Sequence, residues 1–155
     1  MEYVSVTELP YDLFRELLTE YYRDGEDADT PQEQMDEFIR YLHGMCVEGT
    51  IHGVVDMGEK PAGFVLWGMD RADWPFSNWP GLGTILEIGL RKEFRGSARG
   101  SALVRFAESQ MEAKGYYVCA YGPAEAFWKK CGYTDSGKLA ENGLKLMIKG
   151  DCGGR

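Results

Sequence analysis

The segment from residue 84 to residue 103 constrains the fold more than any other part of the chain. Residues 84–90 form an apolar run typical of a largely buried strand, residues 95–100 form a turn, and a helix follows directly. A strand that leads through a short turn into an amphipathic helix predicts a sheet that helices flank. The expected inward face of this helix is Leu103, Phe106, Ala107 and Gln110 or Met111.

The turn consists largely of small residues. Backbone N–H groups at the start of a helix have no partner within the helix, and the helix dipole favours negative charge there. Small side chains let an anion approach these groups closely, while Arg95 and Arg99 add two cationic donors suited to a pyrophosphate or a sugar phosphate. The turn therefore predicts a phosphate site. The small residues are Gly96, Ser97, Ala98, Gly100 and Ser101.

Two common phosphate-binding loops do not fit the turn. A P-loop requires a lysine directly after its last glycine, and Ser101 follows Gly100. A dinucleotide fingerprint requires the spacing GxGxxG, which Gly96 and Gly100 do not provide. Both are excluded.

The remaining periodicities predict the element order βααβββαβαββ, an α+β fold with a mixed sheet in an α/β/α sandwich. Two strands at residues 50–56 and 62–67 read as a hairpin, and a first helix ends near Asp24. In the second helix, Thr30 with Glu33 reads as a capping box and Pro31 as the first helical residue. We expect that helix to bury Met35, Phe38, Ile39 and Leu42 and to end near Gly44, and Gly115 to cap the third helix.

We expect one domain over residues 1–149 and a flexible tail over residues 150–155, with a closing strand pair around 133–134 and 144–148. The net charge of −8 argues against a nucleic-acid binder and suits either a cationic substrate or solubility alone. The four cysteines lack metal-ligand spacing, so we expect no metal and a reducing compartment. No apolar run approaches the length of a membrane span, and no secretory signal is evident, so the cytoplasm is the default expectation.

Residues 86–103 resemble the strand–turn–helix core of the GCN5-related N-acetyltransferase (GNAT) superfamily. Its signature [Q/R]-x-x-[G/A]-x-[G/A] is met by Arg95, Ala98 and Gly100. A second block, residues 124–133, resembles the alanine, aromatic pair and Gly-aromatic that follow in that family. The two blocks occur in the expected order and at a suitable separation.

The resemblance implies an N-acyltransferase with acetyl-CoA, or another acyl-CoA, as co-substrate. It implies that the N–H groups of the turn hold the CoA pyrophosphate and that the backbone of Leu90 and Lys92 pairs with the pantetheine arm. The N–H of Leu90 would polarise the thioester carbonyl, and Gly89 would permit either a bulge or close packing. The implied CoA-binding residues are Ile88, Leu90, Lys92, Arg95, Gly96, Ser97, Ala98, Arg99, Gly100, Ser101, Phe127, Trp128 and Lys130.

Amide formation requires a base that removes a proton from the amine. Glu87 is the candidate because it is the lone carboxylate in an apolar strand, although a structural role is an open alternative. The family commonly has tyrosine where Trp128 stands, and an indole N–H is no practical acid. Tyr121 and Tyr133 are the substitutes that we consider for the acid.

The acceptor is expected to be a small-molecule or peptide amine, with no nucleic-acid or membrane partner and with a homodimer left open. Trp74, Phe76 and Trp79 form a candidate aromatic wall for this acceptor, or else pack their own loop down. The alternative function is a CoA-binding regulatory or interaction module with degenerate catalysis, which Trp128 favours.

Overall fold

The computed structural model describes residues 2–25 and 27–152 of the 155-residue chain. Its seven strands form a mixed, mostly antiparallel sheet in the order β1-β2-β3-β4-β5-β7-β6. The helices and strands follow the predicted order βααβββαβαββ, so the α+β fold with a mixed sheet is confirmed. The chain divides into two compact units, the first comprising residues 1–66 and 87–103 and the second residues 67–86 and 104–155.

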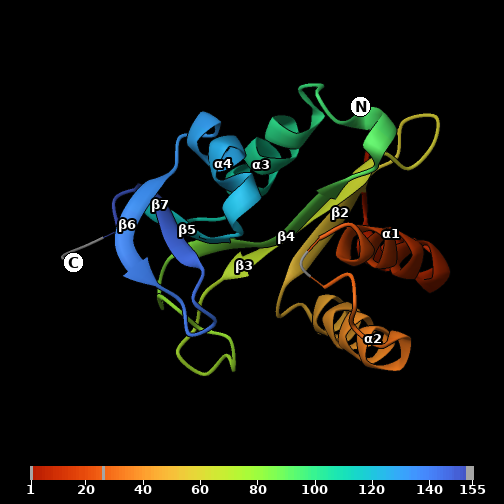
Figure 1. The fold of residues 1–155 in the computed structure, drawn as a ribbon, viewed down its shortest axis with the longest axis horizontal. Coiled ribbons are helices and arrows are strands. Elements are labelled where there is room, and N and C mark those ends of the chain that lie inside the picture. Colours follow the sequence, from red (N-terminus) through yellow and green to blue (C-terminus); the bar gives the residue numbers. More distant parts are fainter. Residues whose placement is uncertain (1, 26, 153–155) are drawn as a thin grey trace. The chain divides into compact units, whose positions relative to one another are not determined.

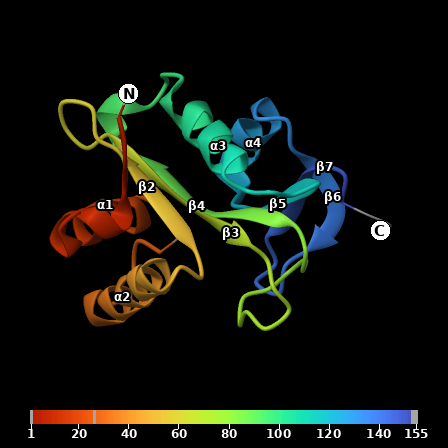
Figure 2. The same ribbon diagram turned by 180° about the vertical axis from the view of Figure 1, so that it is seen from behind.

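The first unit contains two long helices that pack against each other. They are α1 (Tyr11–Arg23) and α2 (Gln32–Glu48), and both lie beside β2 in Figures 1 and 2. The strands of this unit are β1 (Tyr3–Ser5), β2 (His52–Asp56), the start of β3 (Gly63–Met69) and the end of β4 (Gly83–Leu90). Short 3-10 helices cover Val6–Glu8 and Lys92–Phe94.

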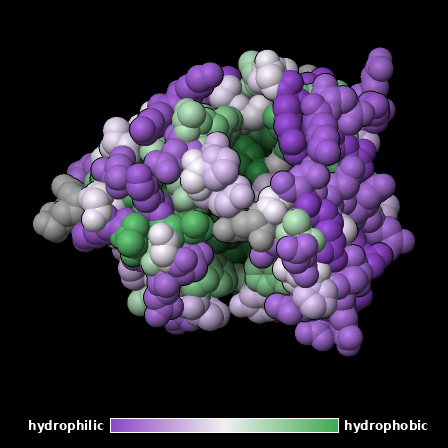
Figure 3. All heavy atoms as spheres, viewed as in Figure 1, coloured by the Kyte–Doolittle hydropathy of each residue, from purple (hydrophilic) through white to green (hydrophobic). Residues whose placement is uncertain are grey.

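The core of the first unit is formed by the inward faces of these elements. Phe14, Leu18, Ile39, Val55 and Phe64 are almost completely buried. The outward faces of the helices are polar, and hydrophilic side chains cover the region of α1 in Figure 3. Burial of one helical stripe is the main source of stability for such surface helices.

Four predictions for α2 are wrong, namely its first residue, its capping box, its last residue and the burial of Phe38. Pro31 is the N-cap rather than the first helical residue, and no side chain caps this end, because Arg23 donates to the carbonyl of Thr30 at 2.6 Å and holds the preceding loop. The helix continues through Gly44 to Glu48 because Met45 and Cys46 extend its buried stripe, and Gly49, at φ +80°, ends it. Phe38 is 46% exposed because the buried stripe is Met35, Ile39, Leu42 and Cys46.

The second unit contains the start of β4 and the strands β5 (Gly115–Ala120), β6 (Thr134–Leu139) and β7 (Lys145–Gly150). β4 and β5 pair in parallel at Gly83↔Tyr116 and Thr84↔Tyr117, whereas β7 pairs antiparallel with β5 and β6. The helix α3 (Arg99–Ser109) enters this unit from the first, a 3-10 turn covers Gly122–Ala124, and α4 spans Glu125–Lys130.

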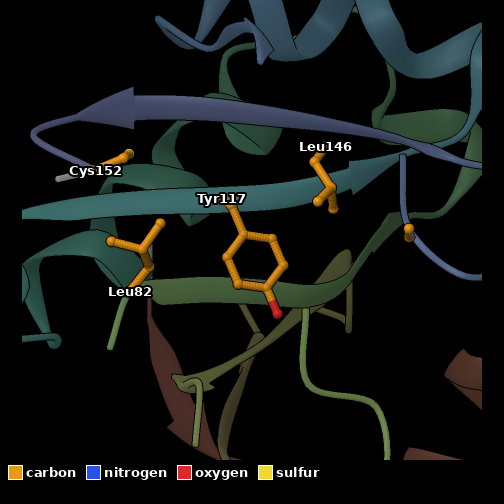
Figure 4. Packing of buried hydrophobic residues seen from close by; sticks show 5 residues of the cluster. Leu82, Tyr117, Leu146 and Cys152 are labelled. Carbon is orange, nitrogen blue, oxygen red and sulfur yellow. The ribbon is translucent and has the colours of Figure 1, made fainter. Parts of the chain in front are cut away.

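The core of the second unit includes a cluster of Leu82, Tyr117, Ala140, Leu146 and Cys152, and Figure 4 shows the ring of Tyr117 between Leu82 and Leu146. Gly115 belongs to β5 and does not cap α3, which ends at Ser109. A Cβ at Gly115 would lie 2.3 Å from the carbonyl oxygen of Asp151, so close backbone contact requires this glycine.

The predicted tail begins at residue 150, whereas Gly150 is the last residue of β7 and Cys152 is buried. The rest of that tail, residues 153–155, lies outside the described residues. A single domain over residues 1–149 stays a prediction.

Candidate active site

The turn that the sequence singles out lies on the surface of the first unit. Gly96 has φ +81°, a conformation that side-chain-bearing residues rarely adopt, and a Cβ there would meet no atom within 4 Å. The carbonyl of Ala98 accepts the N–H of Ala102 at 3.0 Å, which makes Ala98 the N-cap of α3. Its methyl side chain cannot accept a hydrogen bond from the first turn of the helix.

The exposed turn suits an anion. Ser97 Oγ accepts the N–H of Arg99 at 3.4 Å and donates to the carbonyl of Phe94 at 2.6 Å, so one side chain fixes the shape of the turn. The next N–H groups, those of Gly100 and Ser101, lie in the first helical turn, where helix geometry provides no acceptor. The open space at Gly96, the N–H groups at the start of the helix and the positive end of the helix dipole together fit a phosphate.

Two cations between β4 and α3, Lys92 and Arg95, share one carboxylate. Arg95 donates from Nε to the carbonyl of Leu90 at 3.1 Å, and its Nη2 lies 3.4 Å from Oδ2 of Asp24. Nζ of Lys92 lies 3.6 Å from Oδ1 of the same Asp24, at the end of α1. Both cations therefore lie where a second anion could replace Asp24.

Arg99 points to different partners. Its Nη1 lies 3.6 Å from Oδ2 of Asp56, and its guanidinium lies over the ring of Phe94, 4.7 Å from the centroid. Asp56 is completely buried, and neither carboxylate oxygen has a hydrogen-bond partner. Nothing in the sequence pattern pointed to this carboxylate, since Asp56 is simply the last residue of a strand.

A pocket of about 350 Å³ lies within the first unit, between α1 and the strands β3 and β4. Tyr21 and Glu20 of α1 line one side, and Phe64, Gly89 and Leu90 line the other. Arg91 also lines the pocket and is paired with Glu20 at 2.8 Å and Glu16 at 3.2 Å. The pocket is therefore lined by apolar residues on the strand side and by ion-paired side chains, Arg91 and Glu20, at its edge.

Glu87, the predicted base, lies on the face of β4 that meets α1. It accepts a hydrogen bond from the hydroxyl of Tyr21 at 3.3 Å and another from the hydroxyl of Tyr22. Tyr22 is buried, and burial first, then the charge of Glu87, raises its pKa far above the ordinary value. The hydroxyl of Tyr22 therefore stays a donor, and the two bonds fix the orientation of the carboxylate.

Gly89 lies two residues after Glu87 on the same face. A Cβ there would lie 2.8 Å from Cδ1 of Tyr21 and 2.9 Å from Cε1 of Phe64. Of the two explanations that the sequence offered for this glycine, these contacts favour close packing. The glycine lets the ring of Tyr21 lie against the strand and so brings its hydroxyl to Glu87.

The predicted CoA residue Ile88 is half-buried on β4 in the first unit, whereas Phe127, Trp128 and Lys130 lie in the second unit. Trp128 is buried, with its ring 5.1 Å from that of Phe127 and 5.3 Å from that of Tyr133. Lys130 is exposed at the end of α4. Phe127 and Trp128 thus form an aromatic cluster with Tyr133.

The two tyrosines considered for the acid differ in environment. Tyr133 is buried and donates to Glu108 at 2.7 Å, and burial first, then this hydrogen bond, raises its pKa far above the ordinary value. Lys149 pairs with the same Glu108 at 2.9 Å. Tyr121 is 38% exposed on the strand-to-helix connection. These contacts favour a packing role for Tyr133.

The aromatic residues of the predicted acceptor wall lie in a connection that Asp70 organises. Asp70 is 3% exposed and accepts hydrogen bonds from the side chain of Ser77, the N–H groups of Asn78 and Trp79, and the hydroxyl of Tyr117. Trp74 is buried with its ring 4.8 Å from that of Phe76, and Nζ of Lys138 lies 4.6 Å from the ring of Trp79. These rings pack within their own unit, and the wall stays a prediction.

The first unit thus brings together Glu87, Leu90, Lys92 and the turn. Sequence reasoning missed Tyr21, Tyr22, Asp24 and Asp56. The tyrosine pair stands directly before the end of the first helix and could have been matched with Glu87 only through the packing of α1 on β4.

Neither a metal centre nor a membrane-spanning helix is found in residues 2–25 and 27–152. No group of three or more histidine, cysteine, aspartate or glutamate side chains there is arranged to hold a metal ion. No helix in this part of the chain is both long and apolar enough to cross a bilayer.

Comparison with solved structures supports the fold. PaiA N-acetyltransferase from Thermoplasma acidophilum, solved with coenzyme A, shares 13% identity at a TM-score of 0.69 over 97% of this chain and 100% of that one. A GCN5-related N-acetyltransferase from Ralstonia eutropha JMP134 shares 18% identity at a TM-score of 0.70, over 90% of this chain and 95% of that one. AAC(6')-Ib, solved with paromomycin and acetyl-CoA, shares 16% sequence identity at a TM-score of 0.69, over 96% of this chain and 92% of that one.

No curated protein matches the sequence. The model of the Acetyltransferase (GNAT) family matches residues 11–133, which include α1, the strand–turn–helix core and the second sequence block. The resemblance stated from the sequence is thereby confirmed, and the chain belongs to the GNAT family of acetyltransferases.

Proposed function

We propose that this acetyltransferase transfers the acetyl group of acetyl-CoA directly to a primary amine. The observation that carries the proposal is the arrangement within the first unit. An exposed turn that leads into the first N–H groups of α3 follows β4, and Glu87 is held three residues before Leu90 on that same strand.

The turn and its cations are the proposed donor site. The N–H groups of Gly100 and Ser101 would hold the pyrophosphate, and Arg95 would add a charge-assisted hydrogen bond after exchanging Asp24 for a phosphate. Because N–H groups alternate along a strand and that of Arg91 bonds to Ala62 in the β3 direction, the N–H of Leu90 points away from β3. We assign it to the pantetheine or the thioester carbonyl.

When bound, acetyl-CoA supplies an activated thioester, and residues of this chain accept and donate the protons that the reaction moves. Glu87, which the hydrogen bonds from Tyr21 and Tyr22 orient, is the group that would accept a proton from the amine. Glu87 takes a proton from the acceptor ammonium, and the nitrogen lone pair forms the bond to the acyl carbon. The carbon–sulfur bond then breaks, and the nitrogen releases its second excess proton to solvent water as the neutral amide forms.

The departing thiolate must also gain a proton. Of the two candidate tyrosines, we assign this role to Tyr121, because its side chain is partly exposed whereas Tyr133 is buried against Glu108. Tyr121→Phe is then expected to lower kcat about tenfold or more without weakening CoA binding. An unchanged kcat would leave water as the proton source and remove Tyr121 from the mechanism.

A thiol-release assay over a panel of amines tests the proposal. The panel should contain an aminoglycoside such as paromomycin, which AAC(6')-Ib was solved with, together with a polyamine, an aromatic amine and a short peptide. We expect at least one amine to stimulate CoA release. Glu87→Gln should lower kcat about 100-fold or more while CoA affinity is kept, because glutamine accepts hydrogen bonds but no proton.

Glu48→Gln, at an exposed position near the end of α2, is the matched control and should behave as wild type. Trp128, buried where the family commonly has tyrosine, favours the second candidate, a CoA-binding module without catalysis. Tight CoA binding with no amine-stimulated release would establish that candidate and exclude the catalytic proposal.

A further inference from the structure

The loop between β2 and β3 lies against the phosphate turn. Figures 1 and 2 show this yellow loop beside the green segment that precedes α3. Lys60 pairs with Glu93 at 2.9 Å and lies 5.7 Å from the ring centroid of Phe94, on which the guanidinium of Arg99 also lies. The β2–β3 loop therefore contacts the segment 93–99 at several points.

The buried residue at this contact is Asp56, the last residue of β2. Its carboxylate is completely inaccessible, its oxygens accept no hydrogen bond, and the guanidinium of Arg99 lies 3.6 Å away. A buried polar group without hydrogen bonds is rare in folded proteins and calls for an explanation. A buried charge is tolerated where an opposite charge compensates it, and Arg99 is the compensating group here.

This pairing limits what Arg99 can do. If Arg99 turned toward a phosphate in solvent, Asp56 would be left as a buried charge without compensation, which is among the most unfavourable changes in a folded protein. Arg95 carries no such restriction, because its partner Asp24 is exposed. The two arginines of the turn therefore have different roles.

We propose that Asp56 and Arg99 are positioning residues, which hold the first residue of α3 against the β2–β3 loop so that the N–H groups of the turn face the CoA pyrophosphate. Arg99 then acts through Asp56 and the backbone and makes no direct phosphate contact. The inference rests on the proposed binding of CoA at this turn.

Calorimetric titration with CoA, at low and at high salt, tests the pair. Asp56→Asn and Arg99→Gln should each weaken CoA binding about tenfold, and the double variant should be no weaker than either single variant, since coupled residues do not add. The salt dependence of CoA affinity in Arg99→Gln should equal that of wild type, because no phosphate contact is lost. Arg95→Gln should show a weaker salt dependence, because it removes a charge from the phosphate.

Three other results of these titrations would contradict either the inference or the proposed function. If Asp56→Asn binds CoA as wild type does or more tightly, while Arg99→Gln flattens the salt dependence, Arg99 binds phosphate directly and the inference is wrong. If both variants have lower melting temperatures but unchanged CoA affinity, the pair is only structural and the inference is again wrong. If wild type itself binds no CoA, the proposed function fails and the inference fails with it.

Discussion

Asp56 and Asp70 are both buried aspartates at the ends of strands, and they are satisfied in opposite ways. Asp70, in the second unit, is 3% exposed and accepts hydrogen bonds from four groups of its own unit. Asp56, in the first unit, is fully buried, and within residues 2–25 and 27–152 its carboxylate accepts no hydrogen bond and is ion-paired with Arg99. One carboxylate organises a loop, whereas the other compensates a single cation beside the phosphate turn.

The difference shows how burial can serve stability at one site and function at another. Hydrogen bonds to a charged acceptor are each worth about 1.5–3 kcal/mol, so Asp70 contributes to the stability of its loop. A buried ion pair without further hydrogen bonds contributes little net stability, because desolvation offsets the attraction. A carboxylate such as Asp56 is therefore better explained by what it positions than by what it stabilises.

The largest expected effect on stability is that of Asp70→Asn. Its NH₂ group would face donors that now meet a carboxylate, so we expect the free energy of unfolding to fall by about 3 kcal/mol or more. Urea denaturation measures this change. A loss below the uncertainty of that measurement would show that the four hydrogen bonds do not organise the connection.

The same denaturation experiment on Asp56→Asn sharpens the contrast. Removing the charge also removes its desolvation cost, and Arg99, which is 31% exposed, can reach water, so we expect a change of about 1 kcal/mol or less. An equal loss of free energy of unfolding in Asp56→Asn and Asp70→Asn would contradict the claim that the two carboxylates differ in their contribution to stability.

A half-buried carboxylate on α2, Asp36, gives the smallest expected effect. Arg15 lies 3.0 Å from Asp36 between α1 and α2, and its hydrogen bond lowers the pKa of Asp36 below the ordinary value of 3.8. A carboxyl group with a lowered folded pKa stabilises the protein above its unfolded pKa, and this contribution disappears as the pH falls through the folded pKa. Asp36→Asn should therefore lower the melting temperature slightly at pH 7, and the difference from wild type should disappear as the pH falls below the folded pKa of Asp36. A difference in melting temperature that stays constant from pH 7 into the acid range would exclude this ion pair as the cause.

The sequence predicted the order of the α-helices and strands, because most of them carry a local period of apolar residues. The prediction failed at the start of α2, where Arg23, eight residues before Pro31, donates to the preceding loop. It also failed at Phe38, because a helical period alone does not distinguish the edge of a buried stripe from its centre. Glu87 and the turn were identifiable because strand and turn are local. Tyr22 and Asp56 were not, because they meet Glu87 and Arg99 only through tertiary packing.

The central claim, that the turn before α3 holds CoA, is tested most directly by calorimetric titration of CoA into wild type and Ala98→Asp. Aspartate at the exposed N-cap should stabilise the helix by about 0.5–2 kcal/mol, so this variant separates folding from binding. Ala72→Asp adds the same charge at an exposed position in the second unit and is the control. We expect saturable binding to wild type and to the control, and binding at least about tenfold weaker in Ala98→Asp with an equal or higher melting temperature. Equal CoA affinity in all three proteins, or no binding to wild type, would contradict the claim.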